Sequence, residues 1–113
     1  MSVNIYDTAN QMERELRQTK EYTDLKEAYE KIEADEEANA TLKDFQELQQ
    51  TLYAKQQMGQ EISEDEIANL QEVSKRMETN EMTAGLMDKE RQLQQVITDI
   101  NNIIMKSVQD IYQ

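Results

Sequence analysis

Apolar side chains recur at every third or fourth position through most of this chain. Near the N-terminus they are Ile5, Ala9, Met12 and Leu16, separated by steps of four, three and four residues. This spacing puts them on one face of an α-helix. The chain also lacks proline, whose ring would break or kink a helix. The pattern therefore predicts an all-α fold and argues against disorder, although a net charge of -12 is typical of disordered chains.

Local signals divide the chain into a bundle of about five helical segments. The first is expected to begin after Asn4, a good N-cap, and to end at a joint at residues 18–20. A second carries apolar residues from Tyr22 to Ile32, and Asp35 is expected to cap a third. Because 113 residues are enough for one core, we expect residues 1–113 to form a single helical-bundle domain.

The clearest boundary lies between residues 59 and 66. Gly59 is expected to end the third segment in the left-handed conformation that favours glycine. Ser63 and Glu66 then fit a capping box, in which each side chain accepts a hydrogen bond from the backbone N–H of the other residue. A further joint at residues 79–80 separates the fourth segment from the last.

The last segment, Glu81 to Tyr112, is the longest, and at 1.5 Å per residue it would span about 45 Å. Its apolar band widens toward the C-terminus, and a band this broad indicates contact on two sides. We therefore expect a homodimer held by this band and by the N-terminal helix. The predicted interface residues are Ile5, Met12, Leu16, Val96, Ile97, Ile100, Ile103, Ile104, Val108 and Ile111.

Two residues of this last segment carry expectations of their own. Gly85 costs about 1 kcal/mol relative to Ala within a helix, so we expect either a bend at this position or, as the favoured alternative, the close approach of another helix. Glu90 lies in phase between Leu86 and Leu93, so we expect its side chain to be partly buried and to pair with a Lys or Arg across an interface.

The composition excludes several kinds of active site. Because His and Cys are absent, the chain has no Ser-His-Asp triad, no thiol nucleophile and no imidazole or thiolate metal ligand. We predict no enzymatic activity and no cofactor. The 24 acidic residues against 12 basic ones argue against direct binding of nucleic acid, which depends on neutralising phosphates.

The sequence also predicts a compartment. The opening residues lack the basic start and apolar run of a secretory signal. No stretch approaches the roughly 20 apolar residues that span a membrane. We expect a cytoplasmic location and no membrane partner.

Paired carboxylates leave one alternative open, a metal-binding bundle or enzyme that uses carboxylates alone. Glu27 with Glu30, and Glu33 with Glu37, have spacings that put two carboxylates on one helix face. Ferritin-like sites, however, need a Glu-x-x-His motif, and the chain has no His. A solvated acidic face is therefore the favoured interpretation.

Three short stretches carry a family resemblance. They are Val-Asn-Ile-Tyr-Asp-Thr-Ala at residues 3–9, Leu-Arg-Gln-Thr-Lys-Glu-Tyr at 16–22 and Ile-Asn-Asn-Ile-Ile-Met-Lys at 100–106. In order and placement they resemble the YheA/YmcA-like family, also called the YlbF family, and its YheA branch most closely. The resemblance covers nearly the full length and implies a bacterial cytoplasmic helical bundle that tends to dimerise.

The same resemblance implies a regulatory alternative. The YlbF and YmcA branches of the family act in a complex with a third protein, YaaT, which influences messenger RNA processing through a ribonuclease. That complex carries iron–sulfur clusters with Cys ligands, whereas this chain has no Cys and its own side chains cannot ligate a cluster.

The sequence thus predicts a non-enzymatic, cytoplasmic interaction protein that acts as a homodimer. One alternative is a regulatory adaptor subunit for RNA-processing machinery, which would bind a protein partner. The other is the metal-binding bundle or enzyme that uses carboxylates alone.

Overall fold

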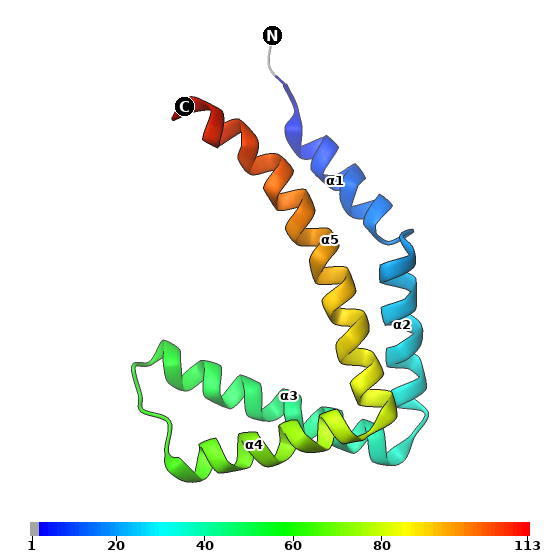
Figure 1. Cartoon of the computed structure of the whole chain (residues 1–113), viewed down its shortest axis with the longest axis vertical. Helices are drawn as coiled ribbons and strands as arrows, with labels where there is room; N and C mark the ends of the chain where they lie inside the picture. Colours follow the sequence, from blue (N-terminus) through cyan, green and yellow to red (C-terminus); the bar gives the residue numbers. More distant parts are fainter. Residues whose placement is uncertain (1–2) are drawn as a thin grey trace. The chain divides into compact units, whose positions relative to one another are not determined.

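The computed structural model describes residues 3–113, so the first two residues of the predicted domain lie outside the described part. These residues form five helices and no strand (Figure 1). The all-α class and the long C-terminal helix are confirmed. The helices are α1 (Ile5–Leu16), α2 (Lys20–Glu33), α3 (Glu36–Gln57), α4 (Glu64–Thr79) and α5 (Glu81–Ile111).

The predicted helix boundaries are confirmed by their capping groups. The side chains of Asn4 and Asp35 each accept a hydrogen bond from the backbone N–H three residues later. Ser63 and Glu66 form a complete capping box, with both N···O distances at 3.1 Å. Gly59 follows α3 with φ of 71°, the left-handed conformation expected at this position.

The chain divides into two compact units. Residues 28–87, here called the hairpin unit, contain α3 and α4. The remainder, here called the terminal unit, is described over residues 3–27 and 88–113 and contains α1 and most of α5. Both α2 and α5 continue from one unit into the other. The single-domain organisation stays a prediction.

Every buried side chain of residues 3–113 lies in the hairpin unit, where α3 packs against α4. Thr83 is fully buried there, and its hydroxyl donates a 2.6 Å hydrogen bond to the carbonyl oxygen of Met77. This bond satisfies a polar group that would otherwise be costly to bury. The buried residues are Ile32, Ala38, Thr41, Leu42, Leu52, Val73, Met77, Thr83 and Leu86.

Two ion pairs join α3 to α4 at the edge of this core. The ammonium of Lys55 lies 2.5 Å from a carboxylate oxygen of Glu66, and the guanidinium of Arg76 lies 3.2 Å from that of Asp44. The hydrogen bond from Lys55, followed by those from Ser63, lowers the pKa of Glu66 from 4.5 to about 2. Glu66 therefore serves both the helix cap and the contact between the helices.

For α5, the close approach of a helix to Gly85 and the partial burial of Glu90 are wrong within the single chain, whereas the pairing of Glu90 across an interface stays a prediction. No heavy atom of the described chain lies within 4 Å of the place that a Cβ of Gly85 would occupy, apart from the helix's own local backbone, so no helix approaches it closely. The side chain of Glu90 is exposed. Helical phase identifies a face of α5, but it does not say which part of that face a neighbouring helix covers.

We expect Gly85→Ala to stabilise the protein by up to about 1 kcal/mol, because Ala loses less backbone entropy in a helix and the position has open space. Thermal unfolding followed by circular dichroism measures this change. Gly59→Ala is the matched control and should lower the melting temperature, since φ there is 71°. A lower melting temperature for Gly85→Ala would contradict the open surroundings of this residue.

The Glu66 pKa predicts a pH dependence. The pKa is lower in the folded state, about 2 against 4.5, so the ionised carboxylate stabilises the fold at higher pH. This contribution is lost as the pH falls from 4.5 toward 2. Glu66→Gln should therefore reduce the acid-induced loss of unfolding free energy, measured by chemical denaturation. Glu61→Gln removes the same charge from the preceding loop and controls for net charge. Equal pH dependence in wild type and Glu66→Gln would refute the assignment.

Candidate interaction surface

The terminal unit has no buried side chain among its described residues. α1 is strongly amphipathic, with Ile5, Met12 and Leu16 on one face, yet none of its residues is buried. The buried residues of α5 are Thr83 and Leu86, which both belong to the hairpin unit. The apolar faces that the sequence places on α1 and on the C-terminal part of α5 therefore stay accessible in a single chain.

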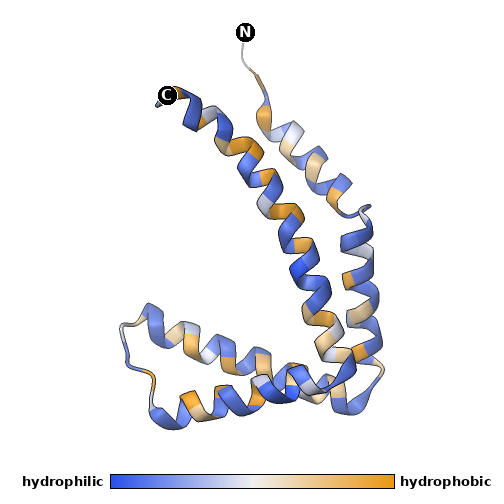
Figure 2. Cartoon of the chain, viewed as in Figure 1, coloured by the Kyte–Doolittle hydropathy of each residue, from blue (hydrophilic) through white to orange (hydrophobic). Residues whose placement is uncertain are grey.

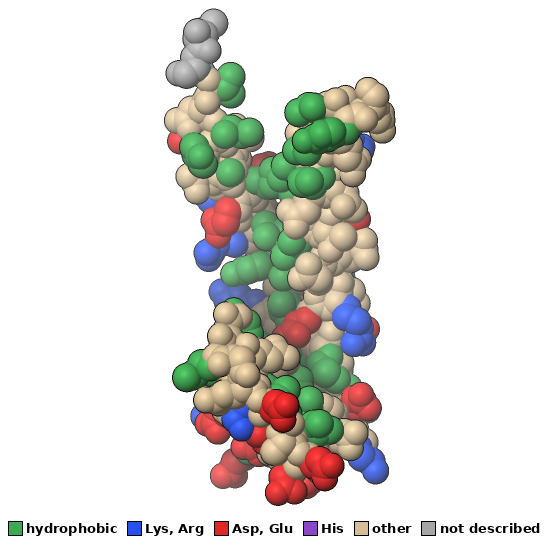
Figure 3. Space-filling model, turned by 90° about the vertical axis from the view of Figure 1, so that its left-hand side faces the viewer, with side chains coloured by type: hydrophobic (Ala, Val, Ile, Leu, Met, Phe, Trp, Pro, Cys, Tyr) green, Lys and Arg blue, Asp and Glu red, His purple; other side chains and the backbone are tan. Residues whose placement is uncertain are grey.

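These two faces border an apolar groove between α1 and α5, with a volume of about 230 Å³. Hydrophobic residues recur along both helices (Figure 2), and their side chains line the space between them in the space-filling view (Figure 3). The groove is lined by Ala9, Met12, Glu13 and Leu16 from α1 and by Ile97, Ile100, Asn101 and Ile104 from α5.

Further exposed apolar side chains belong to the same two helices and their flanking residues. Those of Ile103 and Ile111 are 63% and 76% exposed. Large apolar side chains left this exposed are typical of surfaces that contact another molecule. The exposed large apolar residues of the terminal unit are Val3, Ile5, Tyr6, Met12, Ile103, Ile104, Met105, Val108, Ile111 and Tyr112.

A small ionic cluster ties α2 to α5 within the terminal unit. A carboxylate oxygen of Asp24 lies 2.8 Å from the ammonium of Lys20 and 3.9 Å from that of Lys89. The hydrogen bond from Lys20 lowers the pKa of Asp24. Only the contact with Lys89 joins α2 to α5, and it involves no apolar side chain of either helix.

Charge is unevenly divided between the two units. The terminal unit has 10 acidic and 7 basic residues, a net charge of -3, whereas the hairpin unit has 14 acidic and 5 basic residues, a net charge of -9. Like charges repel across an interface. The terminal unit is therefore the part of the chain better suited to contact a second acidic molecule.

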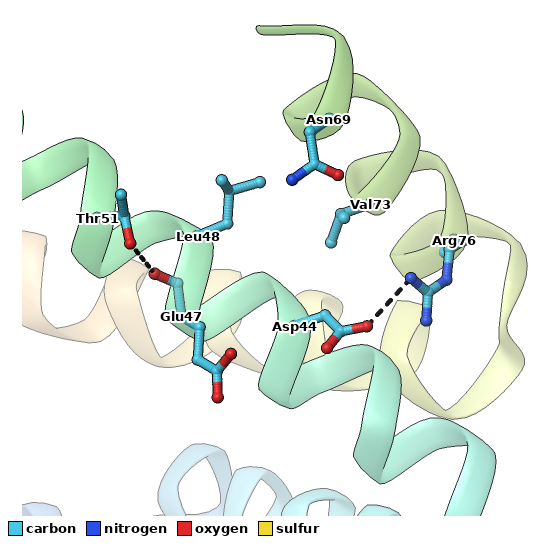
Figure 4. A pocket seen from close by; sticks show the side chains of 7 residues that line it. All are labelled: Asp44, Glu47, Leu48, Thr51, Asn69, Val73 and Arg76. Carbon is cyan, nitrogen blue, oxygen red and sulfur yellow. Dashed lines mark hydrogen bonds and ion pairs between the residues drawn. The ribbon is translucent and has the colours of Figure 1, made fainter. Parts of the chain in front are cut away.

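The hairpin unit has a second hollow, of about 300 Å³, between α3 and α4 (Figure 4). It is largely polar, and two of its charged groups already pair within the chain: the guanidinium of Arg76 lies 3.2 Å from the carboxylate of Asp44. Thr51 donates its hydroxyl to the carbonyl oxygen of Glu47 at 3.0 Å. Because these groups pair internally, the hollow offers a ligand less than the apolar groove does.

The structure brings together half of the predicted interface residues. Met12, Leu16, Ile97, Ile100 and Ile104 line the groove. The other five belong to the same helices outside its lining, with Val96 half-buried and Ile5, Ile103, Val108 and Ile111 exposed.

Three groove residues were absent from the predicted set, namely Ala9, Glu13 and Asn101. Ala9 and Asn101 are in helical phase with the predicted residues of their own helices. That phase had already placed Ala9 on the apolar face of its helix, whereas the polarity of Asn101 concealed the same signal.

The carboxylate-only alternative has no ligand set in residues 3–113. No three acidic side chains there come together in a way that could hold a metal ion. Among the helices of residues 3–113, none has an apolar stretch of the length that a bilayer span requires.

Comparison with known proteins identifies the family of this chain and several similar proteins. A family model described as "Control of competence regulator ComK, YlbF/YmcA" matches residues 5–109. A UPF0342 protein of Pediococcus pentosaceus is 46% identical over 100% of this chain and 99% of its own length. One from Staphylococcus aureus is 39% identical over 99% of this chain and 98% of its own length.

Three solved structures share the fold. A protein of unknown function from Bacillus stearothermophilus has a TM-score of 0.90 and 30% identity, covering 98% of this chain and 97% of its own. The YheA protein of Bacillus subtilis has a TM-score of 0.75 and 29% identity, covering 97% and 100%. Bacillus subtilis RicA, crystallised in complex with RicF, has a TM-score of 0.69 at 19% identity, covering 100% of both chains, which shows the fold alone.

Proposed function

Since this chain belongs to the YlbF/YmcA family, whose model matches residues 5–109, we propose that it is a non-enzymatic interaction protein of the cytoplasm. It acts as a homodimer, and the two copies associate through the groove between α1 and α5. The observation that carries this proposal is the absence of any buried side chain among the described residues of the terminal unit.

The number of exposed apolar side chains supports an interface. A specific interface buries about 800 Å² per partner, and ten large apolar residues of the terminal unit are exposed in the single chain. Burial of apolar area is the main source of affinity in such contacts. Pairing two copies of this surface would complete a four-helix arrangement in which each apolar face is covered.

Charge and symmetry favour a second copy of this chain as the occupant. The terminal unit carries a net charge of only -3, so two copies meet there with little repulsion. A two-fold interface uses the same patch on both subunits. The terminal unit has both an apolar groove and exposed Ile and Val side chains. In a two-fold dimer, the exposed side chains of each copy would fill the groove of the other.

The width of the apolar band on α5 supports the same conclusion. At about 100° per residue, the apolar residues from Leu93 to Tyr112 spread over roughly 200° of the helix circumference. Within the terminal unit, α1 faces the part of this band formed by Ile97, Ile100 and Ile104. Ile103 lies to one side of that part and is 63% exposed, which leaves room for a second helix.

We expect Ile104→Glu to weaken the dimer at least about 100-fold, because association would bury an unpaired charge in the groove. Ile104 is already 53% exposed in the single chain, so folding should be little affected. Sedimentation equilibrium measures the dissociation constant, and far-ultraviolet circular dichroism confirms that the helices remain. Gln109→Glu adds the same charge on the polar side of α5 and should leave the dimer intact.

The wild-type chain itself provides the decisive control. A single species at the monomer mass of 13.3 kDa at micromolar concentration would overturn the homodimer. Equal effects of Ile104→Glu and Gln109→Glu would show that the groove is not the interface.

One comparison favours a second candidate function. RicA, which shares the fold, is crystallised in complex with RicF, so a different protein is a second candidate partner, and the regulatory adaptor for RNA-processing machinery is the form of this alternative that the family resemblance implies. In that role the chain would use the same apolar surface to bind a different protein.

This alternative is tested by purification from the native cell with wild type and Ile104→Glu as paired baits. A YaaT-like protein or a ribonuclease recovered with wild type and lost with Ile104→Glu would support the adaptor. Recovery of the chain alone would count against it.

A further inference from the structure

Asn101 is the one groove residue whose polarity neither the fold nor the proposed dimer explains. The groove is apolar except for Glu13 and Asn101. Glu13 is accounted for, because its carboxylate lies 2.5 Å from the guanidinium of Arg17 on the same helix. Among residues 3–113, no hydrogen bond joins the Asn101 amide to another protein group. In a single chain water satisfies this amide, whereas a helix that covers the groove would remove that water.

We propose that Asn101 sets the register of self-association by pairing with Asn101 of the second copy across the two-fold axis. This inference rests on the proposed homodimer. In a two-fold interface, a residue on the axis meets itself. An amide has both donors and an acceptor, so two copies satisfy each other, whereas two carboxylates or two ammonium groups would not.

The sequence around Asn101 shows why register needs a polar residue. Ile97 and Ile104 are seven residues apart, as are Ile104 and Ile111. If the two α5 helices run parallel, a slip of one heptad therefore superimposes Ile on Ile and costs the apolar contacts little. Seven residues beyond Asn101, however, lies Val108, so the same slip places the amide against an aliphatic side chain. A buried Asn at one core position fixes register in helical assemblies in this way, at a cost in affinity.

The first experiment compares Asn101→Leu with Asn102→Leu in the full chain. Because the sequence has no Cys, Gln109→Cys introduces a single site for a spin label on the exposed side of α5. Pulsed dipolar spectroscopy then gives the distance between labels in the dimer. We expect one narrow distance for wild type and Asn102→Leu. Asn101→Leu should give a broad or multiple distribution, together with a dissociation constant about tenfold tighter.

The second experiment tests whether residue 101 meets itself. Asn101→Asp and Asn101→Lys should each weaken the homodimer at least about tenfold, since like charges would face each other. An equimolar mixture of the two variants should restore dimerisation through a mixed pair, detected by native mass spectrometry. The same mixture of Asn102→Asp and Asn102→Lys should show no preference for the mixed pair.

The outcomes separate this inference from the proposed function. A wild-type chain that stays monomeric overturns both. A wild-type dimer combined with one unchanged narrow distance in Asn101→Leu overturns the register role alone. A mixture of Asn101→Asp and Asn101→Lys that dimerises no better than either variant overturns the self-pairing.

Discussion

The structure depends on an unequal distribution of buried apolar surface. All buried side chains of residues 3–113 belong to the hairpin unit, where Leu42, Val73 and Met77 pack between helices. The terminal unit also has apolar faces, but within the single chain α1 and α5 cover each other only in part and bury none of their side chains there. Because apolar burial is the dominant favourable contribution to folding and association, a chain of this kind gains most by placing a second molecule against those faces.

Charge reinforces this division of roles. The hairpin unit has 14 acidic and 5 basic residues, whereas the terminal unit has 10 and 7. The same sequence therefore combines a highly charged part, which favours solubility, with a part whose charge is low enough for two copies to meet. α5 contributes to both, since Leu86 belongs to the core and Ile104 lines the groove.

Features that depend on residues close together in the sequence could be predicted, whereas features that depend on which helices lie side by side could not. The caps at Asn4, Asp35 and Ser63 depend on residues three apart in the chain, so they could be identified directly. The close approach expected at Gly85 depends on which helix lies opposite, and local phase contains no such information. The groove was anticipated only in part for the same reason. The apolar period identifies a face of α5, but which segment α1 covers is a property of the folded terminal unit.

The polarity of Asn101 shows that an apolar pattern alone does not determine how two copies of the chain align. A stripe of Ile residues at heptad spacing favours association, because it buries apolar surface. It distinguishes poorly, however, between alignments that differ by seven residues. Specificity requires a group that is satisfied in one alignment and unsatisfied in the others. An amide in an otherwise apolar groove is such a group, because its burial without a partner costs more than the pair contributes. In this chain, affinity would come from the Ile and Val side chains and discrimination from the residue that interrupts them.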